Sequence, residues 1–251
     1  MASLGHRSVL DSARATKATG FQAIAASRLA AIFHHRGDLE TAERLFKEAA
    51  FFLRQNPEKG FQELYACLYS LGVLLSARQN YASAEAVLRE AISLCERYGN
   101  DSGSEIAENS RLLSIALAHL GRKNEAEKEI RRTLKIRSRL FGSEDPQVAS
   151  ALTDLGRLLD GMGRSKEAIE IHRQAVRLFE CSQPEDSLEL AVARSSIAAS
   201  FFNLGYSKKA LKQVKRALLV LQRNHGDRDS LREAEQLIEK LTTRDYGTRD
   251  H

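Results

Sequence analysis

The chain has 251 residues, a net charge of +5 and an isoelectric point near 9.1. Its three cysteines, Cys67, Cys95 and Cys181, are odd in number and lack metal-ligand spacing, which argues against a secreted disulfide framework and a zinc site. No stretch approaches the roughly 20 apolar residues of a membrane span, and residues 1–20 contain no apolar run typical of a signal peptide. We therefore expect a soluble cytoplasmic protein with free, buried thiols.

In chain order, residues 1–22 form an N-terminal segment whose weak apolar set would suit a short cap. Five repeats follow, with predicted bounds 23–64, 65–106, 107–148, 149–190 and 191–232. A capping helix is predicted over 229–241 and a disordered polar tail over 242–251. Seams between helix pairs fall at Pro57, Gly99, Gly142, Pro184 and Gly226, residue types that commonly follow the end of a helix.

The repeats are defined by an alanine that recurs every 42 residues. Four more columns keep the same step, and one of them holds small residues that would let two helices approach to about 8–10 Å between axes. A shared period of this kind indicates stacked supersecondary units rather than one globular core. The columns are Ala42, Ala84, Ala126, Ala168, Ala210; Leu29, Leu71, Leu113, Leu155, Ile197; Ala30, Gly72, Ser114, Gly156, Ala198; Gly37, Gln79, Gly121, Gly163, Gly205; and Ala49, Ala91, Thr133, Ala175, Ala217.

The fourth repeat shows why each unit should be a helix–turn–helix. Asp145 before Pro146 is typical of a helix start, and Gly161 and Gly163 are expected to break that helix. A second helix is then predicted to end before Cys181. Apolar residues recur at helical spacing along both segments: Val148, Leu152, Leu155 and Leu159, then Ile171, Ala175 and Leu178.

The C-terminal helix is predicted from a capping box made by Ser230 and Glu233. An apolar face follows it, with charged residues on the opposite side. The terminal unit of a solenoid needs a polar outer face of this kind. The apolar face comprises Leu231, Ala234, Ile238 and Leu241.

The columns resemble the tetratricopeptide repeat, most clearly in the fifth unit. The 42-residue period resembles the variant found in kinesin light chains, and residues 144–149 (Glu-Asp-Pro-Gln-Val-Ala) resemble the seam of that variant. The resemblance implies an all-α fold: an α-solenoid of about five helix–turn–helix units in a right-handed superhelix, with a C-terminal capping helix. The fifth unit carries Ile197, Ala198, Phe201, Gly205, Ala210 and Ala217.

The resemblance also implies that the first helix of each unit lines a concave groove that holds a peptide or helix of another protein. Tyr69, Val73 and Ile115 would supply apolar anchors there, and Arg111 and Arg157 positive charge. We therefore expect a partner segment with hydrophobic anchors and at least one acidic residue. The predicted partner-binding residues are Tyr69, Val73, Arg111, Ile115, His119, Thr153, Arg157, Phe202 and Asn203.

Two departures limit what the family implies about the partner. Chaperone-binding members clamp a C-terminal carboxylate with Lys and Asn, where this chain has Ser27 and Ala31. Kinesin light chains carry paired asparagines before the Leu-small step, where this chain has pairs such as Tyr69-Ser70 and Ser195-Ser196. We therefore transfer neither chaperone binding nor motor-cargo binding.

Motifs for chemistry are weak. Residues 160–163 (Asp-Gly-Met-Gly) contain Gly-x-Gly, but in a helix–helix turn rather than after a strand. His34 and His35 point about 100° apart on a helix, so we interpret them as surface or groove histidines rather than as a metal site. His172 occupies the column of Phe46 and Leu88, which predicts a buried or half-buried position. We expect no enzyme activity, no cofactor and no bound metal.

One charged feature stands out, and by helical phase it faces away from the groove. A solvated outer face is the favoured interpretation, with an anionic partner surface as the alternative. The stripe is Lys208, Lys209, Lys212, Lys215 and Arg216, and a looser version is Arg131, Arg132, Lys135, Arg137 and Arg139.

The function predicted from the sequence is a non-enzymatic adaptor or scaffold for protein–protein interaction, with a protein or peptide segment in the groove. The alternative is a regulatory sensor module gated by a peptide ligand. We expect neither a membrane nor a nucleic acid as the partner, because no membrane segment is present and aromatics are not interleaved with the basic residues.

Overall fold

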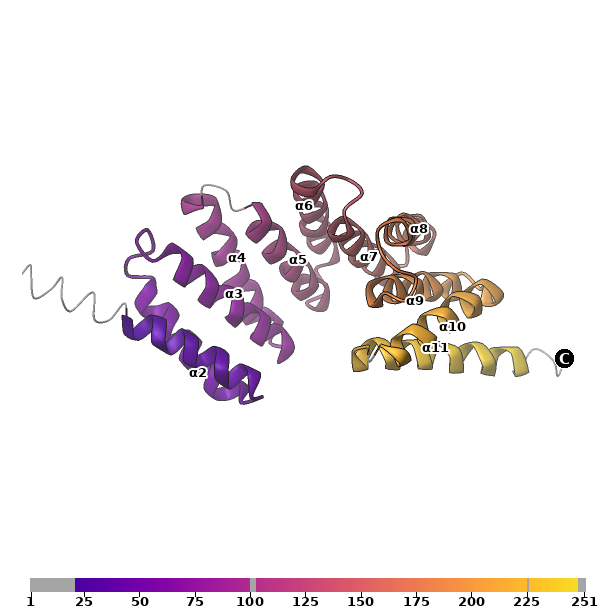
Figure 1. The fold of residues 1–251 in the computed structure, drawn as a ribbon, viewed down its shortest axis with the longest axis horizontal. Helices are drawn as coiled ribbons and strands as arrows, with labels where there is room; N and C mark the ends of the chain where they lie inside the picture. The colour runs from indigo at the N-terminus through magenta and orange to yellow at the C-terminus, as the bar shows by residue number, and fades with distance from the viewer. Residues whose placement is uncertain (1–20, 100–102, 225, 248–251) are drawn as a thin grey trace, which may run out of the picture. The chain divides into compact units, whose positions relative to one another are not determined.

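The computed structural model describes residues 21–99, 103–224 and 226–247, and every regular element among them is an α-helix (Figure 1). The predicted cap in residues 1–20 lies outside the described residues. The helices are 21–35, α2 (Leu39–Leu53), α3 (Phe61–Ala77), α4 (Tyr81–Tyr98), α5 (Gly103–His119), α6 (Lys123–Phe141), α7 (Pro146–Gly161), α8 (Ser165–Ser182), α9 (Leu188–Asn203), α10 (Ser207–Arg223) and α11 (Arg228–Gly247).

The chain forms two compact units, which divide between Arg122 and Lys123. In unit 1, α3 packs on α2 and α4, and α5 packs on α4 and contacts α3. In unit 2, each helix from α6 to α11 packs on the next, and α9 also contacts α7 and α11. Helices thus pack in sequential pairs, which confirms the predicted all-α fold. The bounds of the five repeats stay a prediction.

The glycine column marks the turn inside each helix pair, and it is explained by the backbone. Gly37, Gly121, Gly163 and Gly205 have φ between 78° and 83°, and Gln79 has φ 59° at the equivalent place. A left-handed residue is the common way to end a helix, and glycine adopts it without steric cost. Gln79 is the only non-glycine residue with positive φ in the described part of the chain.

Both alanine columns lie in the core. Ala42, Ala84, Ala126, Ala168 and Ala210 have no exposed surface, and neither do the five members of the second column. The Leu column is buried from Leu71 to Ile197, whereas Leu29 in the first helix is 44% exposed. The periodic small residues are therefore packing positions, as the period predicts.

The fourth repeat follows its prediction closely. Asp145 caps α7, since its Oδ1 accepts a hydrogen bond from the Gln147 backbone N–H at 2.7 Å, and Pro146 occupies the first turn. The apolar face from Val148 to Leu159 is buried. The end of α8 was predicted two residues too early, because the helix continues through Cys181 to Ser182.

The C-terminal helix starts at Arg228, one residue before its predicted start, but its capping residue was predicted wrongly. Asp227, not Ser230, caps α11: its Oδ1 accepts from the backbone N–H groups of Asp229 and Ser230, at 3.1 and 2.9 Å. A carboxylate three residues before Ser230 therefore satisfies free N–H groups in the first turn of the helix, including that of Ser230 itself. The helix also extends past residue 241 to Gly247, into the predicted tail.

The apolar face of α11 is buried as expected. Ala234 and Leu241 are at most 2% exposed, and Leu231 and Ile238 pack at the edge of the same cluster. Leu237, which the sequence analysis left out, is 8% exposed and completes that face.

The three cysteines are free, but they are not alike. Cys67 and Cys95 are buried in unit 1, whereas Cys181 near the end of α8 is exposed. The expectation of three buried thiols is thus wrong for Cys181. His172 is fully buried, which confirms the position predicted from its column.

No described helix is both long enough and apolar enough to cross a bilayer.

Candidate partner-binding surfaces

In unit 1, Tyr69 is the end of an aromatic ladder on α3. Phe61, Tyr65 and Tyr69 are spaced four residues apart, so they share one face of the helix. Their neighbouring ring centroids lie 6.4 and 6.2 Å apart, with interplanar angles of 29° and 28°. All three side chains are half-buried, which leaves aromatic surface available for contact.

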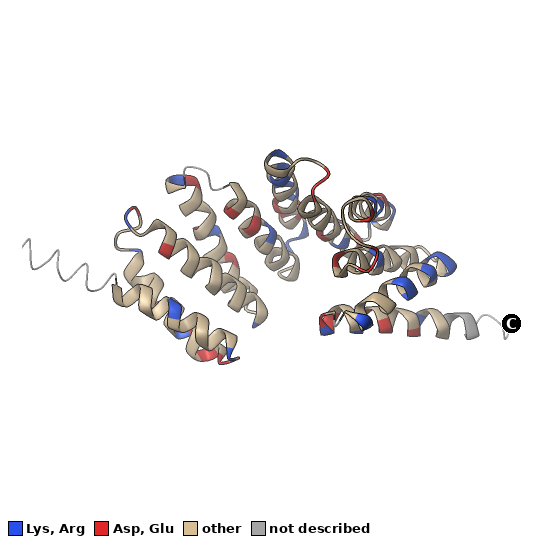
Figure 2. Cartoon of the chain, in the orientation of Figure 1, with Lys and Arg blue, Asp and Glu red and all other residues tan. Residues whose placement is uncertain are grey.

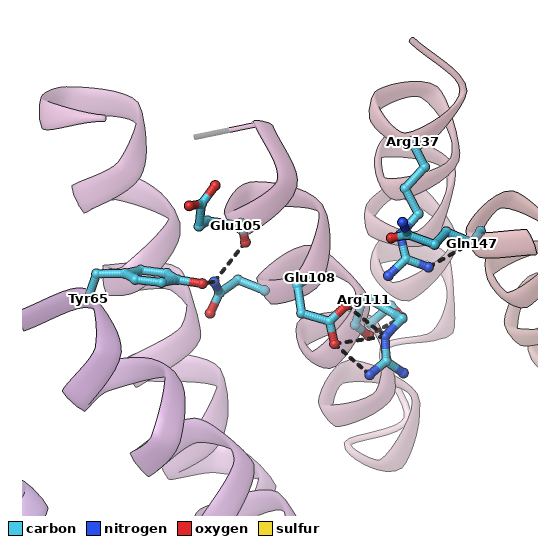
Figure 3. Close-up of polar contacts among 8 residues, drawn as sticks. Tyr65, Glu105, Glu108, Arg111, Arg137 and Gln147 are labelled. Carbon is cyan, nitrogen blue, oxygen red and sulfur yellow. Dashed lines mark hydrogen bonds and ion pairs between the residues drawn. The ribbon is translucent and has the colours of Figure 1, made fainter. Parts of the chain in front are cut away.

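Arg111 on α5 lies beside the ladder, but its charge is compensated. Its guanidinium donates to the Glu108 carboxylate from Nη2 at 2.8 Å and from Nε at 3.2 Å, the contacts drawn in Figure 3. Burial, followed by the Glu108 charge, raises the pKa of Tyr69, and Arg111 opposes the shift. Tyr69, Glu108 and Arg111 therefore form one mixed apolar and charged patch.

The rest of the ladder is tied to α5 by Asn109. The Asn109 side-chain amide donates to the Glu105 carbonyl at 2.8 Å and, at the longer distance of 3.4 Å, to the Tyr65 hydroxyl (Figure 3). Burial raises the pKa of Tyr65 to about 12. Asn109 thus links Tyr65 of the ladder to α5.

Val73 and Ile115 continue the same surface one helical turn further along α3 and α5, and both are half-buried. His119, at the end of α5, is exposed but stacks on Tyr81 of α4, with ring centroids 4.1 Å apart and parallel planes. One face of its ring is therefore covered by the protein itself.

In unit 2 the predicted partner-binding residues differ in their exposure. Thr153 is only 5% exposed, and its hydroxyl donates to the Ala149 carbonyl of the same helix at 3.0 Å. Because this short side chain turns back to its own backbone, Thr153 is not a surface contact, contrary to the prediction. Arg157 is exposed and pairs with Glu233 of α11, with Nη2 and Oε1 3.1 Å apart.

Arg157, Phe202 and Asn203 line one pocket of about 330 Å³ between α7, α9 and α11. The capping helix contributes Glu233, Gln236, Leu237 and Lys240 to the wall, and Asp160, Ser195, Ser196 and Ala199 complete the lining. The C-terminal helix therefore covers part of the surface that was predicted to receive a partner.

Asp160 links this pocket to the core. It accepts hydrogen bonds from the Ser200 hydroxyl and, at 3.4 Å, from the Asn203 amide, and the Nε2 of buried His172 lies 3.6 Å from Oδ2. Burial acts to raise the pKa of Asp160, but the nearby His172 ring and the hydroxyl groups of Ser165 and Ser200 together lower it. The pocket thus has an ionised carboxylate at its floor.

The looser basic stripe of α6 is not a free cationic face. Arg131 pairs with Glu127, and Arg137 is only 7% exposed and donates to the Gln147 carbonyl at 2.9 Å (Figure 3). The phase argument that placed all five α6 residues on the outer side is therefore wrong for Arg137.

Comparison with known proteins identifies the repeats. The family profile for the tetratricopeptide repeat matches residues 64–137 and 105–180. These matches show tetratricopeptide repeats over residues 64–180 of the chain. Comparison of the sequence with curated proteins found no match.

Solved structures show the same fold at low sequence identity. A putative kinesin light chain from Podosopora anserina with nearly identical TPR-like repeats has a TM-score of 0.68 at 15% identity, over 81% of this chain and 96% of that one. Aspartyl phosphate phosphatase F from Bacillus subtilis has a TM-score of 0.72 at 16% identity, over 91% and 57%. A Rap protein complexed with competence and sporulation factor has a TM-score of 0.63 at 15% identity, over 86% and 64%.

The sequence analysis missed residues of two kinds. Phe61 and Tyr65 could have been found, because their four-residue spacing from Tyr69 is visible in the sequence. Glu108 at i−3 from Arg111 is also a readable pair. The pairing of Glu233 with Arg157 could not have been predicted, since it depends on how α11 packs against α9.

Proposed function

We propose that this tetratricopeptide repeat protein is a non-enzymatic adaptor that binds a segment of another protein on surfaces formed by neighbouring first helices. Tetratricopeptide domains generally mediate protein interactions, and their fold is typically non-catalytic. The observation that carries the proposal is the half-exposed aromatic ladder on α3 beside Arg111. Aromatic and arginine side chains are the residues most often found to dominate binding energies.

The proposed partner segment has hydrophobic anchors and at least one acidic residue. The anchors would contact Tyr69, Val73 and Ile115. In the free protein Arg111 and Arg157 are already paired with Glu108 and Glu233. An acidic partner residue would therefore exchange with one of these carboxylates rather than meet an isolated charge, which lowers the net gain from that contact.

The test is affinity capture from a lysate of the source cells, followed by titration of the captured protein. Tyr69→Ala with Arg111→Ala should weaken binding by more than about 2 kcal/mol. The melting temperature should change little, because both side chains are partly exposed.

A matched control removes one aromatic and one arginine elsewhere in unit 1. Phe51 is 62% exposed and Arg44 is exposed, both on α2. Phe51→Ala with Arg44→Ala should leave the affinity unchanged. If the double substitution on α2 abolishes binding and the double substitution of Tyr69 and Arg111 does not, the binding surface has been assigned to the wrong helices.

A regulatory module gated by a peptide is the second candidate. It is favoured by the similarity to the Rap protein, which was solved with a peptide factor. The same capture experiment separates the two candidates, because an adaptor retains a folded protein whereas a sensor retains a short peptide.

A further inference from the structure

Helix α10 carries a face with basic residues and no acidic ones. Its residues Ser207–Arg223 include six Lys or Arg and no Asp or Glu, and in Figure 2 the helix shows blue without red. Ala210, Val214, Ala217 and Leu221 are fully buried, and at 100° per residue the cations lie on the opposite side. The α10 cationic face comprises Lys208, Lys209, Lys212, Lys215, Arg216 and Arg223, all exposed.

These charges are uncompensated. Within the part of the chain that the structure describes, none of the six residues forms an ion pair. Lys209 has a different contact, since its Nζ lies 5.2 Å from the ring centroid of Tyr206 and 5.8 Å from that of Phe201. Like charges on one helix face repel each other, so this face gains by meeting an anionic surface.

The equivalent helices of earlier repeats neutralise their cations with a carboxylate that keeps the 42-residue step. Glu43, Glu85 and Glu127 each contact two basic side chains. One lies on the same helix as the glutamate, and the other lies just after the end of the next helix in the chain. The same column holds Ile169 in α8 and Leu211 in α10. The pairs are Glu43 with Lys47 and Arg78, Glu85 with Arg89 and Arg122, and Glu127 with Arg131 and Arg164.

Leu219 lies in the middle of the α10 cationic face and is 50% exposed. Its angular position on the helix falls between those of Lys215 and Lys212. Tyr206, immediately before α10, is 51% exposed. The face therefore offers apolar contact as well as charge, a combination typical of protein interfaces.

We propose that the α10 cationic face is a second interaction surface, separate from the α3–α5 and α7–α9 surfaces, and that its partner is an acidic segment of another protein. From Lys208 to Arg223 the face is about 22 Å long, at 1.5 Å per residue. From Lys208 to Arg216 the cations recur at three- and four-residue steps, about 5–6 Å apart, and Arg223 follows seven residues later. Acidic residues at three- and four-residue steps on a partner helix would match the first five cations.

Two other anionic partners fit the face less well. Single-stranded nucleic acid needs aromatic platforms along the basic groove, whereas the exposed aromatic ring here, Tyr206, stands at one end. An interfacial membrane helix buries its apolar face in lipid, whereas the apolar face of α10 is already buried in the core of unit 2. Leu219 alone is too little apolar surface for insertion.

The test uses the full chain and a synthetic helical peptide of about 20 residues with Glu at i, i+4 steps on an Ala background. Binding is measured by fluorescence anisotropy at about 50 mM salt, where surface charges are weakly screened. Lys212→Glu with Lys215→Glu should weaken binding at least about tenfold. The same peptide with Gln in place of Glu should not bind.

The matched control makes the same charge change on two other helices of unit 2. Lys128 on α6 and Lys166 on α8 are exposed, and Lys128→Glu with Lys166→Glu should leave peptide affinity within about twofold. An equal loss in both double variants would overturn the proposal, because net charge alone would then explain binding. Circular dichroism of each variant checks that the helices are intact.

Two further probes separate the alternative occupants. A single-stranded oligonucleotide or a phosphatidylserine-containing vesicle that bound more tightly than the peptide, and lost binding in Lys212→Glu with Lys215→Glu, would overturn the choice of partner. Failure of the Glu peptide to bind the natural chain would overturn the surface itself. Tyr69→Ala with Arg111→Ala should not affect this peptide, so the outcome is independent of the groove proposal.

Discussion

Units 1 and 2 solve the same packing problem with different chemistry. In unit 1, a Cβ on Gly72 would lie 2.7 Å from Leu88 Cδ2. In unit 2, a Cβ on Gly156 would lie 2.4–2.7 Å from three ring atoms of His172. The two pairs are at equivalent positions, two repeats apart. A glycine is needed at both places because the side chain of the second helix fills the space beside it.

The two units differ in the polarity of the side chain that packs against the glycine and in the groups around that side chain. Leu88 needs only apolar neighbours, whereas the ring nitrogens of His172 bring a polar group into the core. Asp160, close to His172, is held by Ser200 and Asn203 and reaches the pocket between α7, α9 and α11. In unit 2 the interior and the candidate binding pocket are therefore connected through polar groups, whereas in unit 1 the apolar side chain of Leu88 makes no such connection.

The largest expected difference between the units is in thiol reactivity. Burial raises the pKa of Cys67 from its ordinary 9.0 to about 11, which lowers the reactive thiolate fraction about a hundredfold. Cys95 is also buried, and Cys181 in unit 2 is exposed. With a disulfide reagent, one thiol should react fast and two should react only when unit 1 opens.

The variant Cys181→Ser identifies the fast thiol. It should remove the fast phase and leave the slow phase unchanged. Two fast thiols in the natural chain would show that the core of unit 1 is more open than its burial indicates.

The next effect compares the two glycines directly. Gly156→Ala should lower the free energy of unfolding by about 3 kcal/mol, because the new methyl group meets a rigid ring. Gly72→Ala should cost only about 1 kcal/mol, since it meets the end of a leucine side chain that can change rotamer. Urea unfolding of both variants measures the difference.

Gly161 supplies the control for replacing a helical glycine. A Cβ there meets nothing within 4 Å, so Gly161→Ala should be neutral or slightly stabilising. If Gly72→Ala and Gly156→Ala lowered the free energy of unfolding equally, the side chains of Leu88 and His172 would move aside equally easily, and the proposed difference between the units would be wrong.

The fold was predictable because its determinants are local and periodic. The alanine columns and the turn glycines recur at the 42-residue step, and Asp145-Pro146 is a local signal for the start of a helix, so all of them can be read from the sequence. Thr153 and Arg137 show the limit of that approach. Helical phase gives the direction of a side chain, but its exposure depends on what the neighbouring helices cover, and hydrogen bonds to Ala149 and Gln147 hold these two inside.

The candidate site was predictable in part for the same reason. Tyr69 and Arg111 are partly exposed on α3 and α5, and their role in partner binding stays a prediction. The pairing of Arg157 with Glu233 joins residues 76 positions apart, and no period relates them. Asp227 as the cap of α11 was equally hidden, because a Ser-x-x-Glu pattern three residues later offered a stronger local signal.

Asp160 should make the stability of unit 2 sensitive to acid. The pKa of Asp160 is lowered from its ordinary 3.8, so its ionised form stabilises the folded state above that pH. The contribution disappears as the pH falls through the lowered folded-state pKa. Asp160→Asn should cost about 1–2 kcal/mol at pH 7 by weakening charged hydrogen bonds.

Urea unfolding at several pH values tests this. The stability gap between the natural chain and Asp160→Asn should narrow as the pH drops below about 4. A gap that stays constant down to pH 2 would show that the side chain acts through shape and not through its charge.

The smallest expected effect concerns the turn that breaks the glycine column. Gln79 in unit 1 has φ 59°, whereas Gly163 has φ 78° at the equivalent turn of unit 2. Because a side chain in the left-handed region costs about 1–2 kcal/mol, Gln79→Gly should stabilise the protein by up to about 1 kcal/mol after the added flexibility of the unfolded chain is counted. Gly163→Gln should destabilise it by a similar amount. Thermal unfolding measures both effects, and we expect them to have opposite signs. If both changes destabilise the protein, the side-chain contacts of Gln79 outweigh the cost of its left-handed backbone, and this turn of unit 1 stabilises the fold.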